Sequence, residues 1–429
     1  MDSSAVMEVV RAPATPSPGV GKRRAGGSSR RASMLGPAFV AAIAYVDPGN
    51  VATNFAAGAT SGYLLLWVVV AASLVAILVQ FQAAKLGIAT GKSLPALCRE
   101  RFARRGNLLL WAQAEIVVLA TDVAEFTGAA IGMRLLFGMP VALSAAVTAV
   151  VSLLLLELRR RGRTRPFELM STAALILVGA GVGYDIVCVG HQSGSGFVSG
   201  LAPGFAGAHS LVLAMGIVGA TVMPHAIYLH SGLVQGRGWT PDAARRSPSL
   251  VRRALRTDCL LGLGVATLVN TSMIAFGVGL AAATGGAWTG DIVGAHVELT
   301  GRIGGAAALA FAVALLSSGI SSCGVGTLAG DIVMRGFLGR RLPLHLRRVV
   351  TMAPAVLFLM LGVPVTELLI FSQVILSLGV PVALFLLIGF CRDRSVMGPL
   401  VNAPVTTRLA GCSGAVVAVL GCCLPITLL

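Results

Sequence analysis

Two short stretches combine a proline with side chains that can bind a cation, and each stands inside a long apolar run. They are Asp47 to Asn50, which reads DPGN, and Met223 to His225, which reads MPH. Proline removes a backbone donor and glycine tolerates non-helical geometry, so both stretches predict a break in a helix. Each break falls about midway along its run. Discontinuous helices at matching positions are typical of membrane proteins that bind a substrate near the bilayer midplane.

The side chains at the two breaks predict a site for a divalent transition metal. A carboxylate at the centre of a spanning helix costs roughly 2.5 to 3.5 kcal/mol on insertion scales, so Asp47 needs a partner there. Asp47 and the side-chain carbonyl of Asn50 are hard oxygen donors, and Met223 adds a polarizable sulfur. Unwound backbone would add carbonyl oxygens. Mixed oxygen and thioether ligation favours transition metals over calcium or magnesium.

Three acids follow a helical spacing in a third apolar run. Glu115, Asp122 and Glu125 are seven and three residues apart, which places all of them on one face of a helix. Arg347 and Arg348 begin a later apolar run and could pair with that face. The acids are interpreted as a proton path. The alternative is a static network of buried ion pairs that orients helices.

Two histidines lie just beyond the second break. His225 is two residues past Met223, and its side chain can titrate near neutral pH, so it is a candidate proton carrier. His230 is interpreted as a side chain that hydrogen-bonds between helices. Neither histidine is part of a catalytic motif. The chain has no HExxH or GxSxG sequence, which argues against a metalloprotease or a serine hydrolase.

The composition places these breaks in a membrane. Hydrophobic residues make up 56% of the 429 residues and only 12% are charged, which is too little polar surface for a soluble protein of this size. The net charge of +16 must come from a few arginine-rich stretches, not from a nucleic-acid-binding surface. The eight cysteines include no CxxC pair, and we expect small apolar fillers and neither disulfides nor a zinc site.

Eleven apolar segments are long enough to be spanning helices, which need roughly 20 residues each. Residues 1–33 are rich in Ser, Pro, Gly, Ala and Arg and predict a disordered basic tail ahead of a transmembrane domain at 34–429. The segments are placed at about 35–58, 61–86, 107–136, 140–158, 166–190, 209–235, 255–284, 303–334, 346–363, 366–391 and 408–428.

The basic residues test this partition, because Lys and Arg collect in cytoplasmic connections. The tail and every second connection together hold 31 of the 33 Lys and Arg. Only Arg134 and Arg302 fall on the other side. We therefore expect a cytoplasmic N-terminus and an external C-terminus. The basic connections are interpreted as topology determinants, with a lipid-binding surface as the alternative.

The motifs resemble the NRAMP family of divalent metal transporters, known in bacteria as proton-coupled manganese importers. The resemblance covers nearly the whole chain beyond the tail, and DPGN together with MPH is highly specific. The family's sixth-helix motif is matched by ATVMPHAIYLHS at 220–231, and its acidic third helix by AEIVVLATDVAEFTGAAIG at 114–132. Its eighth and tenth helices are matched by SSGISSCGVGTLAG at 317–330 and SQVILSLGVPVAL at 372–384.

The resemblance implies an all-α LeuT-type fold of five helices, five inverted helices and one more. Repeat one would span about 35–190, repeat two about 209–391, and the extra helix about 408–428. The metal would bind Asp47, Asn50, the carbonyl of Ala220 and Met223, with Gln373 joining when the site occludes. A proton route is implied from Asp47 and His225 through Asp122 and Glu125 toward the cytoplasm.

The expected function is import of Mn²⁺ or Fe²⁺ with proton cotransport across a bacterial inner membrane. The metal would be the substrate, with no resident cofactor; protons and lipid would be the other partners, and a monomer would suffice. The open alternatives are a magnesium or an amino-acid carrier of the same fold. The sequence departs from the family at four positions: Ala226 stands where Asn is expected, Gly379 and Asp331 where Gln is expected, and Arg335 where Glu is expected. These departures put gating and rate in question more than the substrate.

Overall fold

The computed structural model describes residues 37–160, 164–190, 192–235 and 240–428, and the predicted tail at 1–33 lies outside them. All eleven predicted segments are helical, and the first and sixth are each divided in two. The resulting helices are α2 (Pro37–Ala44), α3 (Pro48–Ser61), α4 (Leu66–Thr90), α6 (Arg104–Phe137), α7 (Val141–Arg160), α8 (Thr164–Val189), α10 (Gly207–Val222), α11 (Pro224–Leu233), α13 (Pro248–Ala283), α15 (Gly305–Leu338), α16 (Leu344–Met360), α17 (Val365–Cys391) and α19 (Pro404–Leu428).

Short helices occupy the connections. The sequence analysis did not predict them, because a helix of three to eight residues leaves little periodic signal. They are α5 (Leu94–Arg101), α9 (Gly194–Ser199), α12 (Pro241–Arg246), α14 (Ile292–Glu298), the π-helix η1 (Leu299–Ile303), α18 (Arg394–Met397) and the 3₁₀ turn η2 (Gly398–Leu400).

Eight helical stretches in the described residues are long and apolar enough to cross a membrane by length and composition. The other three predicted spans are the divided first segment, the apolar part of α7 at Val141–Leu154, and α16, which has 17 residues. Helix α13 begins at Pro248, seven residues before the spanning segment placed at about 255–284. Pro248 suits a first helical turn, and the arginines that follow continue the helix.

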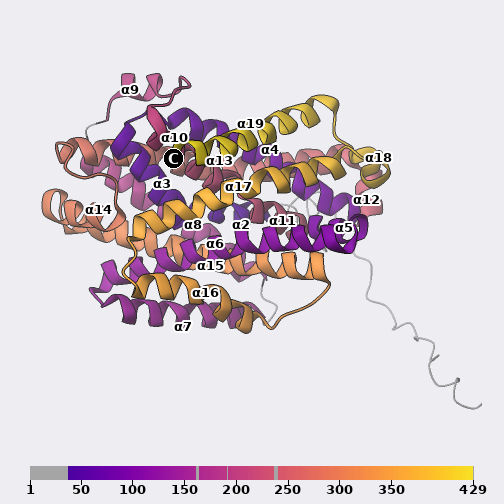
Figure 1. The fold of residues 1–429 in the computed structure, drawn as a ribbon, viewed down its shortest axis with the longest axis horizontal. Coiled ribbons are helices and arrows are strands. Elements are labelled where there is room, and N and C mark those ends of the chain that lie inside the picture. The colour runs from indigo at the N-terminus through magenta and orange to yellow at the C-terminus, as the bar shows by residue number, and fades with distance from the viewer. Residues whose placement is uncertain (1–36, 161–163, 191, 236–239, 429) are drawn as a thin grey trace, which may run out of the picture.

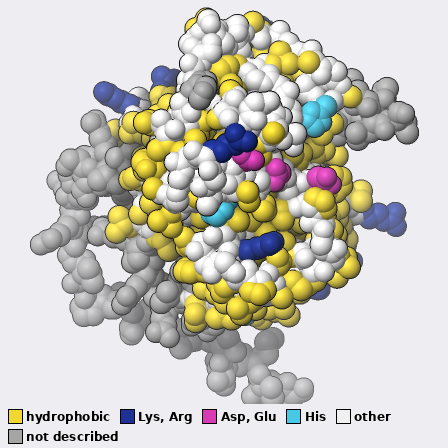
Figure 2. All heavy atoms as spheres, turned by 90° about the vertical axis from the view of Figure 1, so that its left-hand side faces the viewer, with side chains coloured by type: hydrophobic (Ala, Val, Ile, Leu, Met, Phe, Trp, Pro, Cys, Tyr) yellow, Lys and Arg dark blue, Asp and Glu magenta, His cyan; other side chains and the backbone are white. Residues whose placement is uncertain are grey.

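The helices run roughly along one axis, and the connections gather at its two ends (Figure 1). α5, α12 and α18 lie at one end, whereas α9 and α14 lie at the other. Arg99 donates to the carbonyl of Arg335 at 3.1 Å and Arg252 donates to that of Pro399 at 3.3 Å, which joins four basic connections at the first end. Figure 2 looks at the second end, where charged side chains are few among apolar and uncharged ones.

The acidic helix α6 packs closely on α15 through small residues. A Cβ at Gly319 would lie 2.5 Å from the backbone nitrogen of Ala129, and one at Gly132 would lie 2.7 Å from that of Leu316. Small residues of this kind let two membrane helices approach through their backbones. This packing fixes the acidic face of α6 relative to the rest of the core.

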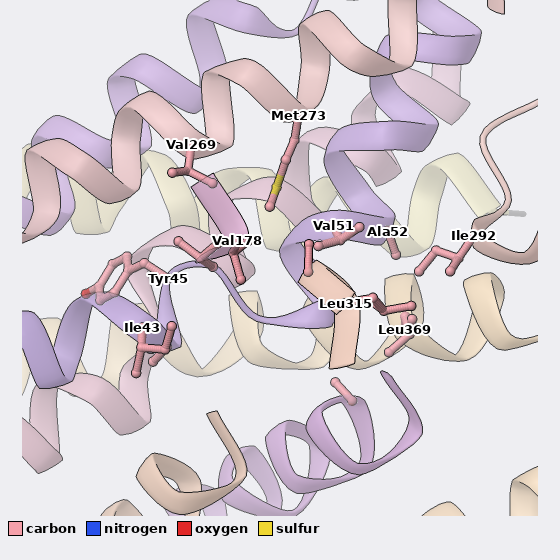
Figure 3. Close-up of a cluster of buried hydrophobic side chains, with 14 of the residues drawn as sticks. Ile43, Tyr45, Val51, Ala52, Val178, Val269, Met273, Ile292, Leu315 and Leu369 are labelled. Carbon is pink, nitrogen blue, oxygen red and sulfur yellow. The ribbon is translucent and has the colours of Figure 1, made fainter. Parts of the chain in front are cut away.

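Apolar side chains surround the first break and also cover the outside of the bundle. Figure 3 shows Tyr45 and Val51 on either side of the break, with Val269 and Met273 from α13 and Leu315 from α15 around them. Large apolar side chains stay exposed on the perimeter, including Leu109, Leu169 and Val187. A perimeter of this kind suits contact with lipid tails.

Candidate metal site and acidic helix

Asp47 is the N-cap of α3, the second half of the divided first segment. α2 ends at Ala44 and α3 begins at Pro48, so the break comprises Tyr45, Val46 and Asp47. Asp47 has extended backbone, and its Oδ1 accepts from the backbone nitrogen of Asn50 at 2.8 Å. An aspartate cap satisfies one of the donors that the start of a helix leaves free, and proline suits the first helical position.

The break therefore lies earlier than the sequence analysis placed it. We expected Gly49 to leave helical geometry, but Gly49 and Asn50 are part of the first turn of α3. Pro48 is preorganised for a helix start, which turns the DPGN sequence into a cap and not into an unwound loop. Gly49 instead permits a close contact. A Cβ there would lie 1.8 Å from the side-chain nitrogen of Gln373 on α17.

The unwound carbonyls are held by side chains from distant helices. Asn270 of α13 donates to the carbonyl of Tyr45 at 2.7 Å, and Ser318 of α15 donates to that of Val46 at 2.5 Å. A buried backbone oxygen without a donor costs free energy, so these side chains stabilise the break. The sequence analysis had treated such oxygens as free ligands and missed both donors.

The second break is a single residue. α10 ends at Val222, α11 begins at Pro224, and Met223 between them has φ 21° and ψ 102°. It is the one residue other than glycine with positive φ in the described chain. Such a conformation is costly for a side chain with a Cβ and persists where the surrounding structure fixes it. Met223 is fully buried.

Asn50 joins the two breaks. Its side-chain nitrogen donates to Asp47 Oδ1 at 2.8 Å and to the carbonyl of Ala220 at 2.9 Å. Three buried polar atoms there have no hydrogen-bond partner, and they are Asp47 Oδ2, Asn50 Oδ1 and Gln373 Oε1. All three are oxygens that could face a cation. Unpartnered buried oxygens on the first broken helix and on α17 are what a transient cation site requires.

Gln373 lies against both broken helices. Its side chain contacts Gly49 of α3, and its backbone carbonyl would be 1.9 Å from a Cβ at Gly219 of α10. Among the described residues, no three His, Cys, Asp or Glu side chains cluster as a metal site. The arrangement thus has one carboxylate with amide and carbonyl oxygens, and it differs from a structural metal centre.

The acids of α6 meet the arginines of α16. Arg348 Nη1 lies 2.9 Å from Asp122 Oδ1 with both side chains buried, and Arg347 Nη2 lies 2.7 Å from Glu115 Oε1. Glu125 is also buried, and neither of its oxygens has a hydrogen-bond partner. The structure thus contains the ion pairs that the spacing suggested, and it leaves Glu125 free to accept a proton.

Thr121 connects His225 to the acidic helix, a contact that the sequence analysis missed. The hydroxyl of Thr121 donates to the carbonyl of Val117 at 2.9 Å, and its oxygen lies 3.0 Å from His225 Nδ1. Because the hydroxyl proton is used, Nδ1 must be the donor in that contact. Neutral His225 then has its lone pair on Nε2, which has no partner in the structure. His225 thereby connects the start of α11 with Thr121 of α6.

His230 takes part in a chain of buried hydrogen bonds. Its Nδ1 lies 3.0 Å from Gln80 Oε1, and Gln80 donates to the hydroxyl of Tyr45 at 2.7 Å. These contacts link α11, α4 and the first break, as expected for a histidine that bridges helices.

Two of the four departures from the family pattern form their own contacts. Arg335 and Asp331 pair with each other at 2.7 Å within α15, and Arg335 is half exposed. Gly379 accommodates neighbours from α6 and α11, since a Cβ there would lie 2.5 Å from Val117. Ala226 is buried beside His225.

The described cysteines are free, and Cys423 lies outside the described side chains. The same holds for the side chains of the arginines at 159–165, which were counted among the basic residues between the predicted segments at 140–158 and 166–190.

Comparison with models of protein families shows to which family this chain is related. Residues 38–427 match the model described as natural resistance-associated macrophage protein-like, or Nramp. The chain belongs to this family. It is 47% identical over 379 residues to the divalent metal cation transporter MntH of Deinococcus radiodurans, and the aligned residues make up 88% of this chain and 85% of that protein. It is 45% identical over 374 residues to MntH of Mycobacterium tuberculosis, covering 87% of this chain and 86% of the relative.

Solved structures agree with this membership. The manganese transporter of Eremococcus coleocola, solved with an aromatic bis-isothiourea substituted compound, superposes with a TM-score of 0.82 at 28% identity. That match covers 95% of this chain and 89% of the other. The transporter MhsT in complex with L-phenylalanine gives a TM-score of 0.62 at 13% identity, covering 92% and 98%, which shows the fold alone. The all-helical LeuT-type fold with two broken helices is thus confirmed.

Proposed function

We propose that this protein is a secondary transporter that imports divalent transition-metal ions, Mn²⁺ or Fe²⁺, with proton cotransport by alternating access. Its relatives carry the name of divalent metal cation transporters, and a solved Nramp structure of the same fold is that of a manganese transporter. The observation that carries the proposal is the junction of the two breaks, where Asn50 binds Asp47 and the carbonyl of Ala220.

The metal would bind Asp47, Asn50, the carbonyl of Ala220 and Met223. Asp47 Oδ2 and Asn50 Oδ1 are buried oxygens without partners, and Asp47 supplies the one negative charge among the four ligands. Binding a cation offsets the cost of burying that carboxylate in the membrane. Asn50 Oδ1 would face the ion. The side-chain nitrogen of Asn50 would keep its hydrogen bond to the carbonyl of Ala220 or lose it as the helices move.

Gln373 would complete the site from α17 during occlusion. Its Oε1 has no partner, and its side chain already contacts Gly49 beside Asp47. Movement of α17 over the breaks would bring an additional amide oxygen to the metal while closing the path to one side. The ligand would then be made and lost once in each transport cycle.

Protons would leave the site through α6. His225 Nε2 can accept a proton, and its Nδ1 contacts Thr121, which precedes Asp122 on α6. Asp122 and then Glu125 would carry the proton onward. Arg348 binds Asp122 and Arg347 binds Glu115, which holds the acidic face in place and offers a charge that compensates its ionised form. The alternative role of these ion pairs, orientation of α6 and α16 alone, predicts no effect on proton movement.

The N-terminus would be cytoplasmic and the C-terminus external in a bacterial inner membrane. Supporting this orientation, the basic connections that include α5, α12 and α18 gather at one end, and α19 runs from that end toward the other (Figure 1). An inward-negative potential would then favour entry of a divalent ion by roughly 4.6 kcal/mol per 100 mV. The repeats would span about 35–190 and 209–391, each beginning with a broken helix, and 408–428 would form the extra helix.

Uptake into vesicles tests the proposal. Purified protein in proteoliposomes should accumulate radiolabelled Mn²⁺, and Fe²⁺ or Cd²⁺ should compete, while a pH-sensitive dye reports protons entering with the metal. Amino acids should not compete, because Asp47 would repel a substrate carboxylate at the helix break. Uptake of Mg²⁺ or of an amino acid in place of Mn²⁺ would support the alternative carriers and refute the proposal.

A further inference from the structure

A cleft of about 440 Å³ lies between α5 and the last turns of α17, at the end of the molecule that carries the basic connections. Its residues on α17 begin at Phe385, twelve positions or about 18 Å of helix beyond Gln373, and the transport mechanism does not use it. Charged and aromatic side chains line it, together with Leu386 and Gly389. The charged and aromatic residues are Arg101, Arg392, Asp393, Phe102, Phe385 and Phe390.

The charges in the cleft leave one positive group uncompensated. Arg101 Nη1 pairs with Asp393 Oδ2 at 2.9 Å, whereas Arg392 is exposed and forms no ion pair with another described residue. The hydroxyl and backbone amide of Ser395, with the Arg101 guanidinium, hold the pKa of Asp393 at about 2, so it is ionised at neutral pH. Two arginines and one aspartate give the lining a net charge of +1.

The apolar side of the cleft has exposed aromatic rings on and beside a helix that is long and apolar enough to cross a membrane. Phe385 is 47% exposed and lies on the spanning helix α17, and Phe102 is 39% exposed just after α5. The guanidinium of Arg101 lies over the ring of Phe390, 5.6 Å from its centre. Aromatic and arginine side chains together are typical of the interface between lipid tails and headgroups.

We propose that this cleft binds an anionic glycerophospholipid, whose phosphate contacts Arg392 and Arg101 and whose acyl chain lies along Phe385. The charge selects an anionic headgroup, because the ammonium of a zwitterionic lipid would meet Arg392. The exposed ring on α17 selects a molecule with an acyl chain over a soluble anion. The phosphate competes with Asp393 for Arg101, and the bound lipid connects α5 with α17.

Lipid binding to the purified full chain tests this assignment. Native mass spectrometry would follow titration with phosphatidylglycerol and with phosphatidylcholine of the same acyl chains, and inorganic phosphate would form a third arm. Wild type should retain phosphatidylglycerol in preference to phosphatidylcholine. The double variant Arg101→Gln/Arg392→Gln should bind it about thirtyfold more weakly, because each arginine near anionic lipid contributes about fivefold.

Two further variants make the test specific. Asp393→Asn removes the competing carboxylate and should strengthen phosphatidylglycerol binding by about fivefold. Arg253→Gln/Arg256→Gln removes the same charge from exposed positions near the start of α13, and it should bind the lipid as wild type does. Equal binding by wild type and the Arg101/Arg392 variant would overturn the proposal. So would equal loss in the Arg253/Arg256 control, or full competition by inorganic phosphate, which would indicate a soluble-anion site.

Discussion

Replacing Gly49 by alanine should impair transport through Gln373 without unfolding the protein. Gly49 lies within the first turn of α3, where alanine is favoured over glycine by roughly 0.5–1 kcal/mol, so the backbone accepts the change. The new Cβ would lie 1.8 Å from the Gln373 side-chain nitrogen. That is about half of an ordinary contact of roughly 3.5 Å, so the amide must move away from the first turn of α3.

The size of the effect follows from what Gln373 supplies. A hydrogen-bond-like contact to a charged group is worth about 1.5–3 kcal/mol, which corresponds to about a tenfold to hundredfold change in rate. Because Gln373 joins on occlusion, we expect the maximal rate of Mn²⁺ uptake to fall by that factor. Equilibrium binding of Mn²⁺ rests on Asp47 and Asn50, so its dissociation constant should change by less than about threefold. The free energy of that change is a few tenths of what the loss of one such contact costs.

A double-mutant cycle identifies the cause. Gly49→Ala should have little additional effect in a Gln373→Ala background, since the displaced side chain is already absent. Gly264→Ala is the matched control, because a Cβ on that glycine of α13 meets no atom within 4 Å. Wild-type uptake by Gly49→Ala, or an equal loss in both backgrounds, would refute the role of Gln373.

Three other substitutions test separate parts of the mechanism. Asp47→Asn removes the one charged ligand and keeps its shape, so Mn²⁺ uptake should be abolished while the protein still folds; unaltered binding in calorimetry would contradict the site. Asp122→Asn retains an oxygen for Arg348 and should weaken proton movement with nearly intact metal binding, whereas full proton flux in vesicles would contradict the route. Met223→Ala should keep measurable Mn²⁺ uptake, lose much Cd²⁺ affinity and allow competition by millimolar Ca²⁺ or Mg²⁺; unchanged Cd²⁺ binding and unchanged exclusion would indicate ordinary packing.

The fold was largely predictable because membrane helices leave strong local signals. Apolar length located the eleven helical segments, and the prolines at 48 and 224 located both breaks. Charge spacing placed Glu115 and Asp122 on one face, where two arginines of α16 now meet them. Each of these features depends on neighbours in the sequence or on the water-to-lipid transfer of single side chains.

The long-range contacts of the site could not be predicted in the same way. Asn270 and Ser318 stabilise the first break from positions more than 200 residues away, and nothing local pairs them with Tyr45 or Val46. Their one signal was an amide and a hydroxyl inside apolar segments, where an unpartnered polar group is costly. Thr121 carried an equally weak signal, because a threonine in a membrane helix usually bonds its own backbone, and this one also does.

X-ray absorption spectroscopy of the Cd²⁺-loaded protein tests the metal site most directly. We expect a sulfur among the oxygen neighbours of the metal in wild type, and its loss in Met223→Leu, which keeps the volume of the side chain. Met273→Leu is the control, because Met273 is also buried near the first break but is not a proposed ligand. It should keep the sulfur. Absence of sulfur in wild type, or its persistence in Met223→Leu, would contradict a ligand set at the junction of the two breaks that includes Met223.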